Sequence, residues 1–163
     1  PALVNELTHF ANERDIIITI ETEGSHFLDT DYPISLISLS PKFSNSIPVL
    51  GAITPQGKVT DERMIKQHSK FRLNYEKIRQ TLDYHTDYHY KPVWDGTDKN
   101  LKEIEEFRVK MKIPKNKTYI MPAGDTRKTL VEMYPLVFEM CAEEGYNMTG
   151  RDHIIAFDTE RGV

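Results

Sequence analysis

The apolar positions in the first third of the chain change from a helical to an extended period. Residues 2–14 carry apolar side chains at three- and four-residue steps, which predicts a helix, and the apolar run at residues 16–20 predicts a buried strand. A second short apolar run at residues 34–39 predicts another strand. This strand ends near Pro41, because proline has no backbone N–H to donate to a neighbouring strand. Residues 43–57 are rich in Pro, Gly, Ser and Asn, which predicts a long loop.

The middle of the chain repeats the alternation of helix and strand. Thr60 and Asp61 are suited to cap a helix that continues to about residue 83, because apolar side chains recur there at helical spacing. Residues 88–94 read as a third strand, although Pro92 indicates a bulge or a sheet end within it. Asp98 is then placed to cap the next helix, and Pro114 closes it.

The last third supplies two more strands and one long helix. Residues 118–121 predict a strand, and residues 126–145 predict a helix that stops at Gly145. Pro135 is expected to kink this helix or to split it in two. A final apolar run at residues 153–157, with His153 at its start, predicts one further strand.

Alternating strands and helices favour an α/β fold, with about five mainly parallel strands covered by crossover helices. The length of 163 residues favours one domain over residues 1–163. The composition is that of a globular protein, since 39% of residues are hydrophobic and 28% are charged.

Charge and hydropathy exclude several classes of partner. The net charge of −4 leaves no general basic field for a nucleic-acid backbone or an anionic membrane. No run approaches the ~18 apolar residues that a membrane span needs, and the N-terminal residues do not resemble a signal peptide. We therefore expect a cytoplasmic protein that binds neither nucleic acid nor membrane.

Cys141 is the only cysteine of the chain. One cysteine excludes a disulfide framework and a cysteine metal site built from a single chain. Its place among apolar residues at helical spacing predicts a small, buried core side chain.

Polar clusters follow the predicted strands, where ligands of parallel sheets collect. Glu21 can accept hydrogen bonds from an amino-heterocycle, and Lys42 can meet a carboxylate. Each cluster has an ordinary alternative, because strand ends commonly carry turn residues and His153 is more often a core histidine than a catalyst. The clusters are residues 21–24, 40–42, 121–124 and 151–153. No local motif among them names a reaction.

Taken in order, these segments resemble the 7-carboxy-7-deazaguanine synthase family of radical S-adenosylmethionine enzymes. The resemblance covers the whole chain, and its most specific parts are Ser40-Pro41-Lys42 and the ending from His153 to Arg161-Gly162-Val163. The other segments that carry it are Pro1-Ala2-Leu3, Glu21-Thr22-Glu23-Gly24, Lys91 and Met121-Pro122.

The resemblance implies that the chain corresponds to the C-terminal two-thirds of such an enzyme. Pro1 matches the last residue of the family's Gly-Gly-(Glu or Asn)-Pro motif, so the CxxxCxxC loop that holds the family's 4Fe-4S cluster is not in this chain. The implied fold is a partial (β/α) barrel. This chain alone is then expected to lack radical activity, and the ligands of the cluster and of the family's Mg²⁺ are expected to be absent from it.

In the family, S-adenosylmethionine supplies an adenosyl radical that acts on 6-carboxy-5,6,7,8-tetrahydropterin. The products are 7-carboxy-7-deazaguanine and ammonia, in an early step toward queuosine and related 7-deazapurines. The intact enzyme is thus a carbon–nitrogen lyase with a small-molecule pterin substrate. A partial barrel without its N-terminal strands leaves an exposed sheet edge and an apolar flank through which two chains can pair, so we expect a homodimer.

Carried over residue by residue, the resemblance assigns two ligand sets. The S-adenosylmethionine set is Ser40, Pro41, Lys42, Met121, Pro122, Ala123 and Gly124. The substrate set is Glu21, His153 and Val163, and no catalytic residue or metal ligand is assigned within this chain. Two other hypotheses stay open. One is another radical S-adenosylmethionine protein, such as a glycyl-radical-enzyme activase, and the other is a non-catalytic α/β ligand-binding module.

Overall fold

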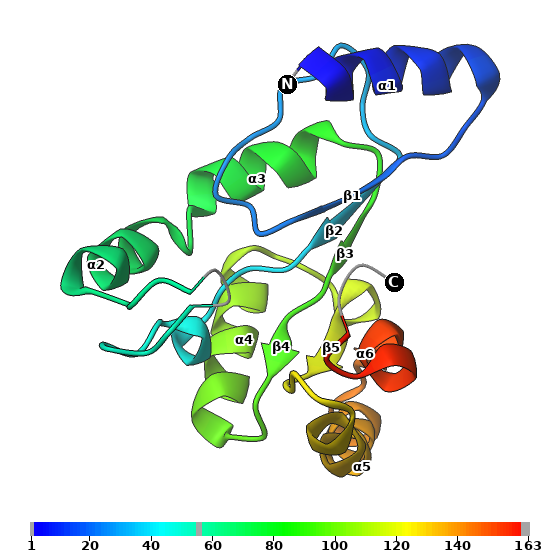
Figure 1. The fold of residues 1–163 in the computed structure, drawn as a ribbon. Helices are drawn as coiled ribbons and strands as arrows, with labels where there is room; N and C mark the ends of the chain where they lie inside the picture. The colour runs from blue at the N-terminus through cyan, green and yellow to red at the C-terminus, as the bar shows by residue number, and fades with distance from the viewer. Residues whose placement is uncertain (1, 55–56, 161–163) are drawn as a thin grey trace. The chain divides into compact units, whose positions relative to one another are not determined.

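The computed structural model describes residues 2–54 and 57–160 and shows an α/β fold (Figure 1). The chain forms two compact units. The first unit comprises Pro1–Ile37 and Pro41–Asp87, and the second comprises Ser38–Ser40 and Tyr88–Val163. The expectation that both belong to a single domain stays a prediction, and each unit is described by itself.

The first unit begins with the predicted N-terminal helix, α1 (Ala2–Arg14), and continues into β1 (Thr19–Thr22). The prediction of a buried strand at residues 16–20 was wrong in position and burial. The strand begins later, its residues are alternately exposed and half-buried, and Ile17 is 79% exposed. The cause is the strand's place at the edge of a sheet with the order β1-β2-β3, where only one side has a neighbour.

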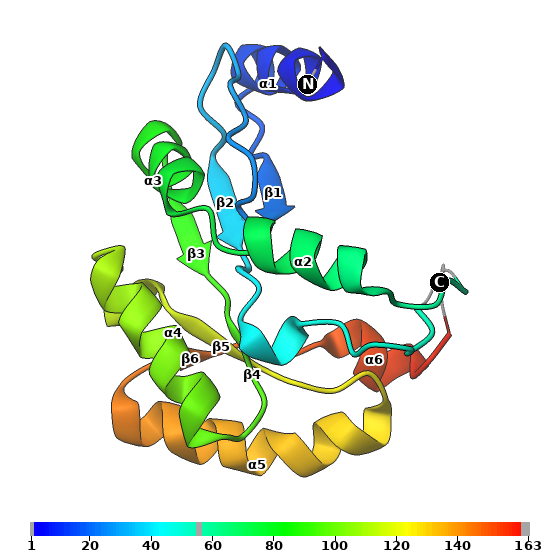
Figure 2. The ribbon, with the colours of Figure 1, turned by 90° about the vertical axis from the view of Figure 1, so that its left-hand side faces the viewer.

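The second strand, β2 (Leu36–Leu39), lies where the sequence predicts it, and three of its four residues are buried. Figure 2 shows β1 and β2 pointing in the same direction, as expected for a parallel pair. The backbone N–H of Leu36 donates to the carbonyl oxygen of Ile18 over 3.1 Å, just before β1. The polar segments after the two strands therefore leave the same edge of the sheet.

The single helix predicted over residues 60–83 is two helices, α2 (Glu62–Phe71) and α3 (Tyr75–Tyr84). Asp61 caps α2 as predicted, because its side chain accepts a hydrogen bond from the N–H of Met64 over 2.7 Å. Asn74 starts α3 in the same way, through the N–H of Lys77. A second side-chain cap interrupts the continuous helical pattern, and periodicity alone does not reveal such an interruption.

The second unit holds a parallel sheet in the order β4-β5-β6. The strand predicted over residues 88–94 divides at Pro92 into two short strands, which confirms the interruption expected there. Figure 2 shows α5 extending alongside β4, β5 and β6. The elements of the second unit are β3 (Tyr88–Tyr90), β4 (Val93–Trp94), α4 (Asp98–Lys110), β5 (Tyr119–Pro122), α5 (Arg127–Glu144), β6 (Asn147–Met148) and α6 (Asp152–Phe157).

Side-chain caps fix the helix ends of the second unit. Thr97, rather than the predicted Asp98, caps α4 and accepts a hydrogen bond from the N–H of Asn100. Thr126 caps α5 and forms a capping box with Thr129, and Gly145 ends that helix in the left-handed conformation, at φ 72°. Pro135 lies inside α5 without dividing it.

The final segment differs most from its prediction. Residues 153–157 belong to the helix α6 and not to a strand, whereas the unpredicted strand β6 precedes them. A run of five apolar residues fits either structure by periodicity. The helix is stabilised by Arg127, whose guanidinium donates to the carbonyl oxygens of Ile155 and Ala156, both over 2.7 Å.

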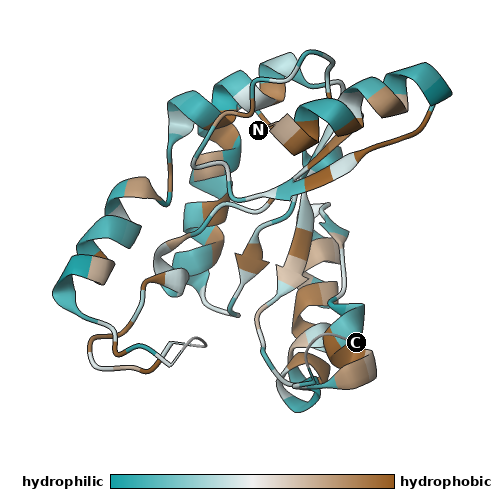
Figure 3. Cartoon of the chain, turned by 45° about the horizontal axis from the view of Figure 1, so that its top comes forward, coloured by the Kyte–Doolittle hydropathy of each residue, from teal (hydrophilic) through white to brown (hydrophobic). Residues whose placement is uncertain are grey.

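The core of the second unit lies between its sheet and the helices α4 and α5. Cys141 is buried there, as the sequence predicts. Figure 3 shows hydrophobic colour on the short strands, whereas α2 of the first unit is mainly hydrophilic and has no buried residue. The fully buried residues of this core include Tyr90, Ile104, Phe107, Ile120, Leu130 and Val137.

Parallel strands with crossover helices confirm the predicted α/β class and are consistent with a partial (β/α) fold. Within the described ranges, none of the helices combines the length and the apolar character that a membrane crossing requires.

Candidate functional site

The first unit has a pocket of about 400 Å³ beside the carboxyl ends of its strands. One wall is the turn after β1, which contributes Glu23, and the other is the helix α2, which contributes His68. We call it the His68 pocket. It is lined by Glu23, Ser25, His26, Gln67, His68, Phe71 and Arg72.

The turn after β1 presents its polar groups through a chain of short hydrogen bonds. The hydroxyl of Ser25 donates to Oε1 of Glu23 over 2.8 Å and lies 2.8 Å from Nδ1 of His26. Gly24 adopts φ 82°, a backbone conformation that favours glycine, and its N–H donates to the hydroxyl of Thr22. The turn therefore holds the carboxylate of Glu23 in place at the pocket wall.

His68 places an unsatisfied polar atom in this wall. Its Nδ1 is buried and has no hydrogen-bond partner among the described residues. Burial lowers the pKa of His68, and the positive charges of Arg72 and Lys42 add to that effect, while the negative charge of Glu23 opposes it. The side chain is therefore a neutral imidazole near pH 7, able to serve a ligand as a hydrogen-bond donor or acceptor.

Arg72 connects the pocket with the segment that follows β2. Its guanidinium donates through Nη1 to the carbonyl oxygen of Lys42 over 3.3 Å. Pro41 is buried and Lys42 is half-buried, so this segment is packed rather than extended into solvent. The contact brings the charge of Arg72 near a residue that the resemblance assigns to S-adenosylmethionine.

The second unit gathers a different set of predicted residues at the carboxyl end of β5. Met121 and Pro122 are buried at the end of that strand, and Ala123 and Gly124 form the turn after it. A side chain at Gly124 would meet Oγ1 of Thr129 at 2.8 Å, so the turn requires glycine. Glycine keeps this turn close to the start of α5 and leaves its backbone accessible to a ligand.

Arg151 joins two of the predicted clusters. Its guanidinium donates a hydrogen bond to the carbonyl oxygen of Gly124, and its own N–H donates to the hydroxyl of Tyr134 over 3.3 Å. The clusters 121–124 and 151–153 are thus brought together within the second unit. Ser40 is also buried in this unit.

Other predicted residues are not brought to a pocket. Glu21 is exposed on β1 and does not line the His68 pocket, whose carboxylate comes from Glu23 instead. His153 is exposed on α6 and is neither a core histidine nor the start of a strand. Val163 lies outside the described residues.

Sequence reasoning missed the contribution of α2 to the first unit's pocket. That contribution comes from His68 and Arg72. The available signal is their four-residue spacing, which places both on one face of a helix. Nothing in the local sequence indicates that this face meets the turn after β1.

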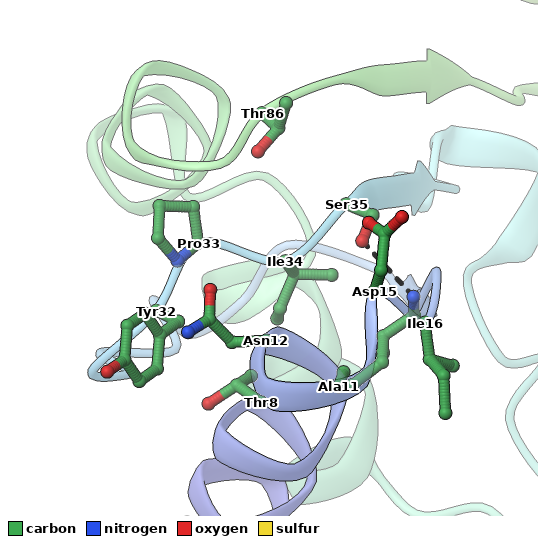
Figure 4. Close-up of a pocket in the computed structure, with 11 residues that line it drawn as sticks. Thr8, Ala11, Asn12, Asp15, Ile16, Tyr32, Pro33, Ile34, Ser35 and Thr86 are labelled. Atoms are coloured by element: carbon green, nitrogen blue, oxygen red, sulfur yellow. Dashed lines mark hydrogen bonds between the residues drawn. The ribbon is translucent and has the colours of Figure 1, made fainter.

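A further pocket, of about 270 Å³, lies at the opposite edge of the first unit's strands. Figure 4 shows Thr8 and Asn12 of α1 facing the segment from Tyr32 to Ser35. Ser35 accepts a hydrogen bond from the N–H of Ile18, just before β1. Since ligands of parallel sheets collect at the carboxyl ends, the His68 pocket is the better candidate of the two.

The residues present do not fit an iron–sulfur cluster. Such clusters need several cysteine thiolates, and the single Cys141 is buried, which raises the pKa of its thiol to about 11. Within the described parts of the chain, no three His, Cys, Asp or Glu side chains gather as a metal site. The glycine turn after β5, by contrast, fits the close approach of a ligand to the backbone.

The fold is that of an α/β protein with candidate ligand sites at the carboxyl edge of its parallel strands. Comparison with known proteins adds a family. The chain is 30% identical over 162 residues to a protein named 7-carboxy-7-deazaguanine synthase from Rhodopirellula baltica. The alignment covers 99% of this chain and 57% of that relative.

This match confirms the resemblance of the chain to 7-carboxy-7-deazaguanine synthase. The relative is named as a synthase, which is an enzyme, and the chain spans 57% of its length. No family model matches the chain. No solved structure matches it either.

Proposed function

We propose that this chain is part of a 7-carboxy-7-deazaguanine synthase, a carbon–nitrogen lyase of queuosine and 7-deazapurine biosynthesis. The whole protein would convert 6-carboxy-5,6,7,8-tetrahydropterin to 7-carboxy-7-deazaguanine and ammonia. The observation that carries the proposal is the 30% identity to the named synthase, which extends over 99% of this chain.

The reaction's adenosyl radical comes from S-adenosylmethionine, reduced by a 4Fe-4S cluster, and the family also uses Mg²⁺. Because one buried cysteine does not fit the cluster, this chain alone is proposed to be inactive in radical chemistry. What its residues contribute is binding and orientation of the two small molecules.

The S-adenosylmethionine set is proposed to be Ser40, Pro41, Lys42 and the turn from Met121 to Gly124. The requirement for glycine at position 124 supports this assignment, since it keeps the backbone of the turn open to a ligand. The hydrogen bond from Arg151 to the carbonyl oxygen of Gly124 orients the turn. Arg151 is thus proposed as a positioning residue.

Glu21 and His153 are proposed to meet the pterin, together with Val163. Glu21 is exposed, and a carboxylate can accept hydrogen bonds from the amino-pyrimidine edge of a pterin. Glu21→Gln turns one acceptor into a donor. It is expected to lower the affinity for the pterin by roughly 5- to 150-fold and to leave the affinity for S-adenosylmethionine nearly unchanged. Lys42→Ala is expected to show the opposite bias.

Calorimetric titration of each ligand against both variants tests this division of roles. Glu6→Gln is the matched control, because Glu6 is an exposed carboxylate on α1. The assignment fails if Glu21→Gln weakens S-adenosylmethionine as much as it weakens the pterin.

We further propose that the protein is a cytoplasmic homodimer. An apolar groove on α5 and α6, lined in part by Val131, Phe138 and Ile155, supports the second part of this proposal. Phe138 is 67% exposed, which is unusual for a large aromatic side chain without a covering partner. Light scattering on the purified chain measures its mass, and a monomer at all concentrations would contradict the proposal.

A glycyl-radical-enzyme activase or a non-catalytic ligand-binding module remains the alternative. Neither is favoured by a specific contact in the described residues, whereas the synthase is favoured by the named relative.

A further inference from the structure

The pocket of about 270 Å³ at the opposite edge of the first unit's strands combines uncharged polar side chains with one carboxylate. We call it the Asp15 pocket, and its polar lining residues are Thr8, Asn12, Asp15, Tyr32, Ser35 and Thr86. We propose that it binds a small hydroxylated primary amine, such as an amino sugar, with the ammonium group at Asp15 and the hydroxyl groups at the uncharged polar side chains. This ligand is additional to the two small molecules of the proposed function.

One wall of the Asp15 pocket comes from α1. Thr8 and Asn12 lie four residues apart on this helix and therefore share one face, and Asp15 follows its end. The hydroxyl of Thr8 donates to the carbonyl oxygen of Asn5 over 2.8 Å, so only its lone pairs remain for a ligand. The side-chain amide of Asn12, which has no hydrogen-bond partner within the described ranges, offers both a donor and an acceptor.

The opposite wall is formed by the segment before β2 and by Thr86, which follows α3. Figure 4 shows the amide of Asn12 pointing up toward Pro33 and the hydroxyl of Thr86 pointing down toward it. The backbone N–H of Thr86 donates to the carbonyl oxygen of Ile34 over 3.1 Å, which fixes the position of this residue. Ser35 accepts a hydrogen bond from a backbone N–H over 3.2 Å, so its hydroxyl hydrogen remains for a ligand oxygen.

The charges around the Asp15 pocket favour a cation. No Lys, Arg or His is found among the described residues that line it. Two cations of α1 are already paired with other carboxylates. Arg14 lies 3.2 Å from Glu13, and His9 contacts Asp31 over 2.7 Å. Asp15, by contrast, forms no ion pair with any residue that the structure describes. A ligand ammonium can therefore bind its carboxylate without displacing a protein cation.

The end of α1 adds negative potential at the same place. This helix has 13 residues, and its last turn borders the pocket through Ala11 and Asn12. The aligned peptide dipoles give the carbonyl end of a helix a partial negative charge, which favours a cation near the last turn. Asp15 follows this turn directly. The carboxylate and the helix end thus attract the same kind of ligand.

The size and the apolar surface of the pocket fit a small ring. The volume of about 270 Å³ is just below the range of about 300–1,000 Å³ that is typical of small-molecule sites. Ala11 and Ile34 are buried in its wall, where they can pack against C–H groups. An amino sugar carries C–H groups on its ring, hydroxyl groups around it and one ammonium group, so its chemistry matches the whole lining.

The test compares three ligands that differ in their polar groups. Glucosamine has the ammonium and the hydroxyl groups, glucose lacks the ammonium, and cyclohexylamine lacks the hydroxyls. Each is titrated calorimetrically against the 163-residue chain at about pH 6, where these amines are protonated. We expect glucosamine to bind roughly 10-fold more tightly than either of the others. Backbone NMR shifts on addition of glucosamine should be largest at residues 12–16 and 32–35.

Variants assign the two kinds of contact. Asp15→Asn removes the charge at nearly constant size, and asparagine readily adopts the left-handed conformation of this position, at φ 53°. It should weaken glucosamine by about 5- to 20-fold and glucose little. Asp29→Asn is the matched control, because Asp29 is exposed in the same unit and does not line the pocket. Thr86→Val removes a hydroxyl and should weaken both sugars but not cyclohexylamine.

Binding of glucosamine that falls in Asp15→Asn and persists in Asp29→Asn supports the inference. Equal affinity for glucosamine and glucose overturns it, as does cyclohexylamine binding as tightly as glucosamine, or no binding of glucosamine at all. Circular dichroism shows whether each variant is folded. If Asp15→Asn does not fold, Thr86→Val decides, and unchanged affinity of that variant for both sugars overturns the inference. None of these results depends on the proposed reaction.

Discussion

The guanidinium of Arg151 donates a hydrogen bond to the carbonyl oxygen of Gly124, two residues that are 27 positions apart in the sequence. The bond ties the segment after β6 to the turn after β5. It explains how a turn that depends on glycine for its backbone conformation is held in a defined position. The proposed S-adenosylmethionine site of the second unit thus includes a residue outside its own turn.

Removal of this hydrogen bond should loosen the turn. We expect Arg151→Met to lower the free energy of unfolding by about 1–2 kcal/mol, because a charged donor is lost at a half-buried position. Affinity for S-adenosylmethionine should fall as well, whereas affinity for pterins should not. Urea unfolding and ligand titration measure the two effects, and an unchanged S-adenosylmethionine affinity would count against a positioning role.

The three side chains of Glu105, Arg108 and Tyr146 make the second unit sensitive to acid. The guanidinium of Arg108 donates to both carboxylate oxygens of Glu105, and the hydroxyl of Tyr146 donates to Oε2. The hydrogen bond from Arg108 is the largest cause that lowers the pKa of Glu105 to about 2, from an ordinary 4.5. Burial and the same carboxylate raise the pKa of Tyr146.

A lowered carboxyl pKa stabilises the fold above the unfolded-state value. The stabilisation is complete above about pH 4.5 and is lost as the pH falls from there toward 2. Glu105→Gln should flatten this dependence and lower stability at neutral pH by about 1 kcal/mol, after allowance for solvent screening. Glu106→Gln is the control, since Glu106 forms only an exposed, 3.9 Å ion pair with Lys102. Equal acid profiles for the two variants in urea unfolding would refute the assignment.

Cys141 should be chemically inert in the folded protein. Burial raises the pKa of its thiol to about 11, so the thiolate population near pH 8 is about 100-fold smaller than for an ordinary thiol. We expect a thiol reagent to modify Cys141 quickly in urea and slowly in buffer. Fast modification of the folded chain would show that the residue opens to solvent.

Reconstitution with iron and sulfide tests the absence of a cluster from this chain alone. One cysteine per chain cannot supply the thiolates of a 4Fe-4S cluster, so no stable cluster absorbance is expected. Cys141→Ala is the control for adventitious iron. A cluster at one per chain that survives this change would contradict the prediction.

The capping box of α5 should contribute measurably to stability. The N–H of Thr129 donates to Oγ1 of Thr126, and the N–H of Thr126 lies 3.3 Å from Oγ1 of Thr129. Thr126→Ala should lower the free energy of unfolding by about 1 kcal/mol, and Thr126→Ser should restore most of it. Thermal unfolding followed by circular dichroism compares them, and an equal loss in both would show that the methyl group matters instead of the cap.

The sequence by itself determined the α/β class and most of the elements of the second unit. The strand before the long loop, the interruption at Pro92 and the stop at Gly145 all follow from local chemistry: apolar runs, a missing backbone donor and a left-handed φ. Local chemistry acts within a few residues, so a single sequence reveals it. The resemblance to 7-carboxy-7-deazaguanine synthase was also readable from the order of the segments, and the 30% identity to the named relative confirms it.

Tertiary structure decided the rest, because the deciding partners are distant in the chain. Residues 153–157 form a helix whose final carbonyl oxygens accept hydrogen bonds from the guanidinium of Arg127, nearly thirty positions away. The pocket in the first unit needs the turn at Glu23 beside the end of α2 at His68 and Arg72. The local pattern of apolar and polar residues indicates neither of these two contacts. Packing of side chains from distant segments selects one of several locally permitted structures, and it alone placed these charges around one pocket.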